Sequence, residues 1–336
     1  MALARTFPGQ LRVVSVALVA AWACSANGYA SAARDSGYTV QTRWPIGGEG
    51  KWDLLVVDSP HNRLFVSRAT RVQEIDLTSG KLLSEIANTP GVHGIALAAD
   101  VGRGFTSNGK ANSVTVFDLE SLATLEEVKI SGDDPDAIVY DTSSRHVYAF
   151  NGHSNNATVI DAVTAKEVGS VALPGRPEFA VSDGKGLIFV NLEDKNALAV
   201  IDVAHNAVRA TWPLAPCDGP TGLALDPSRH RLFSVCHNQR LIVTASDSGK
   251  QVADLPIGAH VDAAAFDPQT LRVSASNGDS ADVTVVLEES ADKYSVRGSL
   301  ATATGAKTMA LDAKSHKLYL PAMTPQGFQV LVAAPN

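Results

Sequence analysis

The sequence is poor in cysteine and in long apolar runs. It has three cysteines among 336 residues, and none are spaced as the CxxC pairs of zinc sites and attached haem. It contains neither an HExxH motif nor a G-x-S-x-G elbow. After residue 32, no segment is long and apolar enough to span a bilayer. These absences argue against c-type haem proteins, zincin metalloproteases, α/β-hydrolases and helical membrane proteins.

Positive charge is also scarce. The chain has 28 Lys and Arg against 35 Asp and Glu, giving a formal net charge of −7. An acidic protein repels the phosphate backbone over most of its surface, so we expect no nucleic-acid partner. With 45% hydrophobic and 19% charged residues, the composition is that of a folded globular protein.

The first 32 residues differ from the rest of the chain. Arg5 and Arg12 are their only charged side chains, residues 13–23 are apolar except for one serine, and small residues surround Ala30 and Ala32. This pattern predicts a cleavable signal peptide, with cleavage after Ala30 or Ala32, and export to the periplasm or the outside of the cell. Removing it would change the formal net charge from −7 to −9, because two arginines leave.

Two cysteines remain after the leader, Cys217 and Cys236. An even number of cysteines in an oxidising compartment predicts one disulfide. The alternative, a thiolate pair on a metal, lacks the close spacing that zinc sites use.

A repeated unit fills residues 33–336. Each copy has an apolar strand ending near an aspartate, a turn and a second apolar strand, as in LLVVDSPHNRLFVS from Leu54. Successive marker aspartates are 41 to 45 residues apart: Asp58, Asp100, Asp141, Asp183, Asp226, Asp267 and Asp312. One four-stranded propeller blade occupies about 40–45 residues. We therefore predict a single all-β domain, a seven-bladed β-propeller with four-stranded antiparallel blades.

The last copy ends after its third strand, at residues 328–332. Residues 38–46 should supply the missing fourth strand, because Thr42–Ile46 (TRWPI) resembles the fourth strand of the fourth blade, Thr211–Leu214 (TWPL). Pairing the first strand with the last closes the ring and removes an open sheet edge.

The strand sequences RLFVS, HVYAFN and LIFVN, with VTVFD, ATVID and LAVID after them, resemble the YVTN-type repeats of YncE-like propeller proteins. The resemblance covers essentially the whole mature chain and implies an exported, single-domain propeller. More distant relatives include cofactor-carrying redox proteins and lactonases, so the family resemblance implies the fold and does not select a chemistry.

In a propeller, the first strand of each blade lines the central channel. Counting back five residues from each marker aspartate gives the expected ring at the channel mouth: Asp53, Ile95, Asp136, Glu178, Thr221, Asp262 and Lys307. Two positions before three of these lie His93, Arg176 and His260. The expected ligand-binding residues are Asp53, Asp136, Glu178, Thr221, Asp262, Lys307 and Arg176. The loops between second and third strands face the same side, where Glu193, His237, His153 and Asn155 are candidates for an outer polar ring.

Carboxylates gathered on one axis repel one another unless something positive joins them. The leading interpretation is therefore a binding protein that holds a cation or a small polar ligand, such as a divalent metal on Asp136, Glu178, Asp262, His93 and His260. The plain structural alternative pairs these acids with Lys307, Arg176 and solvent.

Two further functions stay open. In a lactonase or lyase, the metal would activate water while Lys307 stabilises negative charge. In a docking scaffold, a protein partner would occupy the loop-rich face of what we expect to be a monomer. The segment Gly47–Lys51 resembles part of a phosphate-binding loop, but Trp52 stands where Ser or Thr is required and no helix pattern follows.

Overall fold

The computed structural model describes residues 1–4 and 35–336. The predicted leader beyond its first four residues, both predicted cleavage sites and Cys24 lie outside the described residues. No helix in the described part of the chain is long and apolar enough to cross a membrane.

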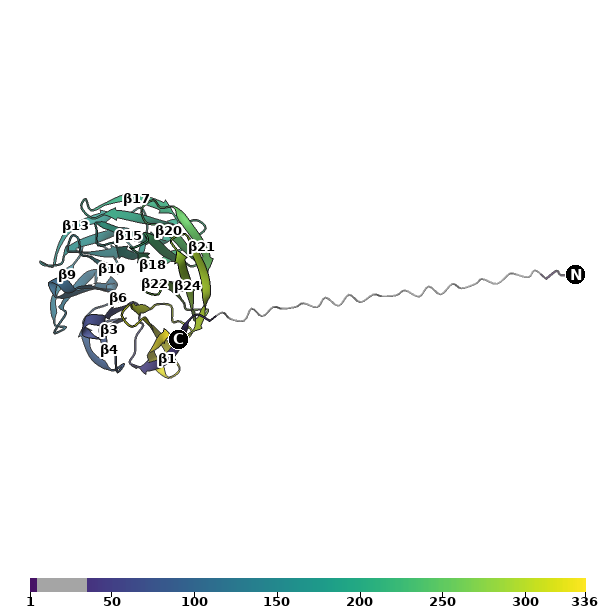
Figure 1. Cartoon of the computed structure of the whole chain (residues 1–336), viewed down its shortest axis with the longest axis horizontal. Helices are drawn as coiled ribbons and strands as arrows, with labels where there is room; N and C mark the ends of the chain where they lie inside the picture. The colour runs from purple at the N-terminus through teal and green to yellow at the C-terminus, as the bar shows by residue number, and fades with distance from the viewer. Residues whose placement is uncertain (5–34) are drawn as a thin grey trace. The chain divides into compact units, whose positions relative to one another are not determined.

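Seven four-stranded antiparallel sheets make up the domain, as the repeat predicts. Figure 1 shows them arranged around a central axis, with β6, β10, β18 and β22 near the centre and β9, β13, β17 and β21 toward the rim. Each sheet follows chain order from centre to rim, except the one that holds both chain ends. The predicted seven-bladed β-propeller is confirmed.

The strands of the first three blades are β2 (Leu55–Asp58), β3 (Arg63–Arg68), β4 (Arg71–Asp76) and β5 (Leu82–Ala87); β6 (Val92–Ala98), β7 (Arg103–Asn108), β8 (Ser113–Asp118) and β9 (Thr124–Lys129); and β10 (Pro135–Asp141), β11 (His146–Asn151), β12 (Asn156–Asp161) and β13 (Lys166–Ala172). Those of the fourth and fifth are β14 (Pro177–Ser182), β15 (Leu187–Leu192), β16 (Ala197–Asp202) and β17 (Ala207–Pro213); and β18 (Pro220–Asp226), β19 (Arg231–Cys236), β20 (Arg240–Ala245) and β21 (Gln251–Pro256). Those of the last two are β22 (Val261–Asp267), β23 (Arg272–Asn277), β24 (Asp282–Ser290) and β25 (Lys293–Ala301); and β26 (Ala310–Asp312), β27 (Lys317–Thr324), β28 (Gly327–Pro335) and β1 (Tyr38–Pro45). Four single 3₁₀ turns complete the described elements: η1 (Ser59–His61), η2 (Ala99–Val101), η3 (Gly109–Ala111) and η4 (Glu193–Lys195).

The ring closes where β1 pairs with β28, as predicted. The register runs antiparallel from Tyr38 opposite Pro335 to Pro45 opposite Gln329. Ile46 continues the contact, because its N–H donates to the carbonyl oxygen of Phe328 at 3.1 Å. The seventh blade therefore combines three C-terminal strands with one N-terminal strand.

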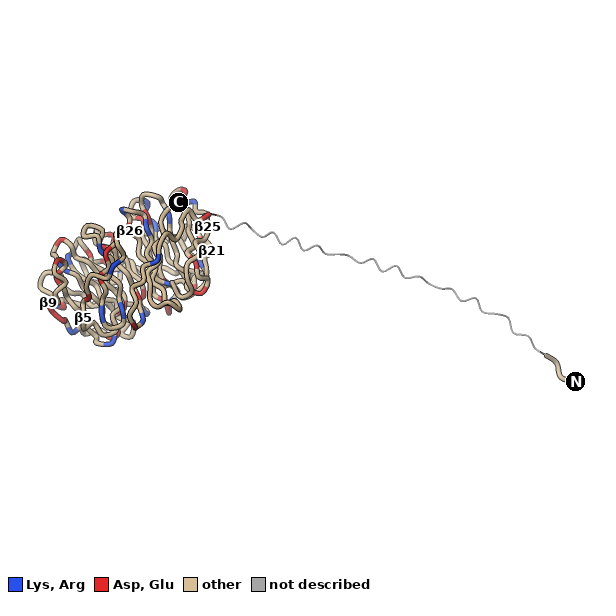
Figure 2. Tube along the Cα trace, turned by 90° about the horizontal axis from the view of Figure 1, so that it is seen from below, with Lys and Arg blue, Asp and Glu red and all other residues tan. Residues whose placement is uncertain are grey.

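The core lies between neighbouring blades. Second and third strands are buried almost throughout, and their Val, Ile, Leu and Phe side chains meet those of the next blade. Outer strands alternate between covered and exposed positions, as β17 does along its whole length. Such alternation is typical of a strand with one face packed and one in water. Figure 2 shows acidic and basic residues interspersed over one side of the ring.

The predicted disulfide joins Cys217 to Cys236, whose Cα atoms are 5.6 Å apart. Cys236 ends β19 and pairs with Pro220 at the start of β18. Cys217 lies three residues before Pro220, so the bridge ties the loop that enters the fifth blade to the second strand of that blade.

Candidate functional site

One residue from each blade reaches the channel mouth at a structurally equivalent position. In blades two to six, the first residue of the inner strand pairs with the last residue of the second strand, as Pro135 does with Asn151. The next residue in the chain belongs to the ring. In the first and seventh blades, Asp53 and Lys307 line the same cavity as these five residues. The full set, hereafter the mouth ring, is Asp53, His93, Asp136, Glu178, Thr221, Asp262 and Lys307.

The second blade requires a correction, because Ile95 does not belong to this ring. The inner strand β6 ends at Ala98, which pairs with Arg103 as Asp141 pairs with His146 in the third blade. Ala98 therefore occupies the marker position, and Asp100 lies in the following 3₁₀ turn. The two-residue offset places His93 in the ring, while Ile95 packs in the core beside Phe65 and Phe117.

A local irregularity in each of these strands directs the ring side chains. In blades two to six the pairing register shifts immediately after the first pair, between Pro135 and Ile138 in the third blade. A β-bulge interrupts the ladder and re-aims a side chain, which is why bulges often lie beside binding sites. Asp136 falls inside the irregular stretch and faces the cavity at the mouth.

Hydrogen bonds between blades fix the backbone of the ring residues. The amide of Asn191 donates to the carbonyl oxygen of Thr221 at 2.9 Å. The hydroxyl of Thr308 donates to the carbonyl oxygen of Asp53 at 2.8 Å. Ser107 and Ser276 make the same kind of bond to Asp136 and Lys307, respectively. Each ring residue so held is positioned by a neighbouring blade as well as by its own.

The mouth ring encloses a cavity of about 380 Å³. Every residue of the mouth ring lines it, together with Leu54, Phe179, Glu193, His237 and His260. Its walls thus combine carboxylates, three imidazoles and one ammonium with the apolar side chains of Leu54 and Phe179. The volume is within the range of small-molecule sites.

His93 is held between two carboxylates. Its Nδ1 lies 2.6 Å from an oxygen of Asp53 and 3.7 Å from an oxygen of Asp136. The hydrogen bond to Asp53, supported by the charge of Asp136, raises the pKa of His93 to about 9. At neutral pH the side chain is therefore an imidazolium that donates to Asp53.

Lys307 forms the second close ion pair, with its Nζ 2.6 Å from an oxygen of Asp262. Burial alone would lower the pKa of Lys307, but the contact with Asp262 raises it. Lys307 is thus already engaged by a carboxylate, rather than free to stabilise negative charge on a substrate. The ion pair agrees with the alternative interpretation, in which the acids of the mouth pair with Lys307, Arg176 and solvent.

Asp136 and Glu178 have no such partner. Neither side chain accepts a hydrogen bond from residues 35–336, and the nearest cationic atoms are those of His93 at 3.7 Å and Arg176 at 3.9 Å. Burial and neighbouring carboxylates raise the pKa of Asp136 to about 6 and that of Glu178 to about 8. The side chain of Asp136 is 37% exposed and faces the cavity, where the surrounding protein limits its solvation. Asp136 and Glu178 are therefore the acidic groups of the mouth ring that have no close cationic partner.

Three predicted residues lie differently from the rest. Thr221 lines the cavity, but its hydroxyl donates to the backbone carbonyl oxygen of Val261 at 3.2 Å. The guanidinium of Arg176 is half-exposed and pairs with Glu193. His260 contacts Asp279 through Nδ1 at 3.0 Å.

The structure brings together part of the predicted metal set. The donor atoms of Asp53, His93 and Asp136 lie within 4.8 Å of one another, the one such trio among the described residues. Glu178, Asp262 and His260 face the same cavity but do not join that trio. A metal on these three residues would have to displace the proton of His93, since an imidazolium has no lone pair to donate.

Two of the residues predicted to form an outer polar ring, on the loops between second and third strands, do reach the cavity. Glu193 and His237 line the cavity, whereas His153 contacts Asp133 and Asp134 outside it. Sequence reasoning missed a second hollow beside the first, which Lys51, Trp52 and Lys110 help to line. Lys110 lies in the same kind of loop as Glu193, so the loop position was the available signal.

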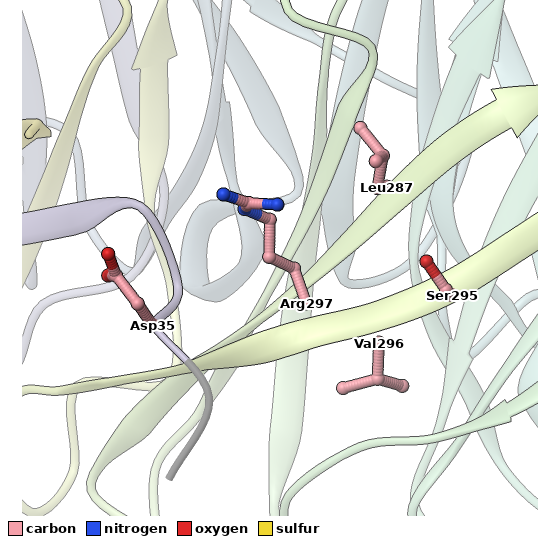
Figure 3. Close-up of a pocket in the computed structure, with 5 residues that line it drawn as sticks. All are labelled: Asp35, Leu287, Ser295, Val296 and Arg297. Atoms are coloured by element: carbon pink, nitrogen blue, oxygen red, sulfur yellow. The ribbon is translucent and has the colours of Figure 1, made fainter.

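Another hollow, of about 340 Å³, lies away from the mouth on the outer strand β25. Figure 3 shows its lining residues, Leu287, Ser295, Val296 and Arg297, with Asp35 from the segment before β1. None of the predicted site residues reaches it. The mouth is therefore the candidate site.

No family model and no curated protein matches the sequence. Among solved structures, the chain is similar to one described as Kuenenia stuttgartiensis hydrazine synthase, with a TM-score of 0.73 and 17% identity over 84% of this chain and 95% of that one. It is also similar to a chain from the mitotic checkpoint complex, with a TM-score of 0.77 and 14% identity over 96% of this chain and 98% of that one. At such low identity the likeness shows the fold alone, and the chain is a seven-bladed β-propeller.

Proposed function

We propose that the protein is an exported binding propeller whose channel mouth holds a small ligand by a positively charged group. The observation that carries the proposal is the pair Asp136 and Glu178. These carboxylates lie on adjacent blades, face one cavity and accept no hydrogen bond from the described residues. Neighbouring carboxylates that share a site without donors repel one another, so a ligand that supplies donors and positive charge gains what the protein lacks.

An organic ammonium group suits this pair. It carries a full charge and three donors, enough to reach two carboxylates at once. The remaining charges of the mouth are already matched, because Asp53 binds His93 and Asp262 binds Lys307. The positive charge therefore belongs between the third and fourth blades.

A metal cation is the second candidate, favoured by the trio of Asp53, His93 and Asp136. Carboxylate oxygens and one imidazole form a donor set that transition metals accept. Binding there would require loss of the His93 proton and of its hydrogen bond to Asp53. Metal binding should therefore begin to weaken as the pH falls below about 9, the pKa of His93.

Export and family membership are part of the proposal. The basic and apolar leader supports export, and the buried disulfide suits an oxidising compartment. The YVTN-like strand sequences support a place among YncE-like propellers. Detection of the mature N-terminus near residue 31 or 33 in an extracytoplasmic fraction would test export.

The binding proposal is tested by thermal shift with alkyl amines, polyamines and divalent metals. The wild type is compared with a double variant, Asp136→Asn/Glu178→Gln, that keeps shape and removes charge. A ligand at 100 times its Kd should stabilise the wild type by about 2.7 kcal/mol. The double variant should be more stable when free and should lose this response.

A matched control is Glu126→Gln/Asp247→Asn, which removes two exposed carboxylates outside the mouth. It should respond as the wild type does. A wild type indifferent to every cation, or a mouth variant that responds equally, would contradict the proposal.

A further inference from the structure

A second hollow of about 610 Å³ adjoins the acidic cavity. It is lined by Lys51, Trp52, Gly91, Val92 and Lys110, and by three residues of the mouth ring. The two hollows share three residues, Asp53, His93 and Lys307, so a ligand can extend from one into the other.

The charge without a partner in this hollow is positive, whereas in the first cavity it is negative. Lys51 and Lys110 are exposed, and no ion pair joins either of them to a carboxylate within residues 35–336. The one carboxylate in the lining, Asp53, is already bound by His93. The hollow therefore presents uncompensated positive charge in a protein that is negative overall.

Much of the lining of this hollow is apolar. Trp52 packs against Phe328, with ring centroids 5.5 Å apart, and lines the hollow beside Val92. Lys110 packs closely on Gly91, where an added Cβ would lie 2.7 Å from the lysine Cγ and 2.8 Å from its backbone nitrogen. The bare glycine thus allows the η3 loop to bring Lys110 to the edge of the hollow.

From this pairing of hollows we infer that the ligand is a small zwitterion, with an ammonium group and an acidic group joined by an apolar frame. This is the class of amino acids and short peptides. The ammonium lies between Asp136 and Glu178, the frame contacts Trp52 and Val92, and the acidic group meets Lys51 and Lys110. The inference rests on the proposed function, because the ammonium occupies the site assigned there.

Singly charged ligands fit one half of the mouth and leave the other unmatched. A polyamine or metal would place further positive charge near the lysines, and a simple anion would meet the carboxylates. A zwitterion satisfies both halves, and each charge-assisted contact adds to its affinity.

The test is calorimetric titration with ε-aminocaproate, hexylamine and hexanoate, and with glycyl-leucine beside its C-terminal amide and its N-acetyl form. For at least one set, the zwitterion should bind the wild type about tenfold or more tightly than the matching amine. The matching acid should bind weakest.

Lys110→Met keeps the alkyl stem and removes the charge. It should lower the affinity for the zwitterion toward that for the amine without weakening amine binding, whereas Glu178→Gln should weaken both. Lys51→Met repeats the test at the other lysine. Lys185→Met, in an exposed turn after β14, is the control and should change nothing.

The outcomes separate the two proposals. If amines bind through Glu178 but the zwitterions bind no better, or if both lysine variants leave zwitterion binding intact, the zwitterion inference is wrong and the binding function stands. If no amine, zwitterion or metal binds the wild type at millimolar concentration, both are wrong.

Discussion

At the scale of single residues, the buried cation Arg68 holds the glycine-rich loop at residues 47–50 in place. It has no exposed surface, and its guanidinium lies 3.6 Å from the ring centroid of Phe328. It donates to the carbonyl oxygens of residues 47–50 at 3.0–3.3 Å. Burial lowers the pKa of Arg68 to about 10, so it stays charged at neutral pH. The glycine-rich loop therefore turns its carbonyl oxygens toward a cation, which is the opposite of phosphate binding.

Arg68→Met should destabilise the protein by about 2–3 kcal/mol, because the loop carbonyls lose their donors inside the protein. Denaturant unfolding measures this. Arg209→Met removes an exposed guanidinium from β17 and is the control. Equal midpoints for the two variants would show that the loop does not need Arg68.

The mouth residues give the unliganded protein an unusual pH dependence. Because folding raises the pKa of Glu178 to about 8, the folded protein binds more protons than the unfolded chain between the ordinary pKa of a glutamate and about pH 8. The raised pKa of Asp136 has the same effect up to about pH 6. The raised pKa of His93 stabilises the folded protein fully below the ordinary pKa of a histidine, and this stabilisation is lost as the pH rises to about 9. All three shifts make the free energy of unfolding fall as pH rises from 5 to 9.

The Tm of the unliganded wild type should therefore fall across this pH range, and that of Glu178→Gln should fall less. Calorimetry at constant ionic strength checks both. A Tm that rises toward pH 9 would contradict the assigned protonation states.

At the scale of elements, a tryptophan on the outer strand of one blade packs against a glycine in a turn of the next blade. Trp44 of β1 covers Gly80, in the turn between β4 and β5. Trp212 of β17 covers Gly249, in the equivalent turn of the fifth blade. Both glycines have positive φ, and a Cβ at either would lie 2.3 Å from the indole. This shared contact accounts for the sequence likeness between Thr42–Ile46 and Thr211–Leu214.

Gly80→Ala and Gly249→Ala should each destabilise the protein by about 2–4 kcal/mol, combining the backbone penalty with displacement of the indole. Gly102→Ala is a matched control, because Gly102 has φ +66 with nothing within 4 Å of the added Cβ. It should cost about 1 kcal/mol from the backbone alone. Three equal changes in unfolding free energy would show that the tryptophan contacts contribute nothing.

The repeat made blade number, closure and most ring positions predictable, because strand alternation and spacing are local properties. It failed in the second blade, where Asp100 imitates a marker from within a 3₁₀ turn and Ala98 holds the real position. The pairings of His93 with Asp53 and of Lys307 with Asp262 join neighbouring blades. They depend on how the blades are rotated around the axis, which no single repeat encodes. Lys110 was missed although its loop position offered a signal, because nothing in one repeat shows that this loop meets Trp52 at one hollow.

At the scale of the whole molecule, closure should govern stability. A chain that begins at residue 47 lacks β1, loses the buried Tyr38 and Trp44, and exposes the edge of β28. Relative to a chain that begins at residue 33, it should lose about 4 kcal/mol or more and tend to associate through the open edge. Calorimetry and light scattering measure both effects. Equal Tm values and equal masses would refute the closure model.

The central claim is that the mouth binds a positive charge through Asp136 and Glu178, and that Glu178 holds a proton at pH 7 when the mouth is empty. The most direct measurement is calorimetric titration of the best-binding cation at pH 7 in two buffers of different ionisation heat. We expect one site per chain and net proton release, because binding ionises Glu178 and part of Asp136. Asp136→Asn/Glu178→Gln should abolish both the binding and the release. Binding with no proton release, or unchanged binding in the double variant, would contradict the claim.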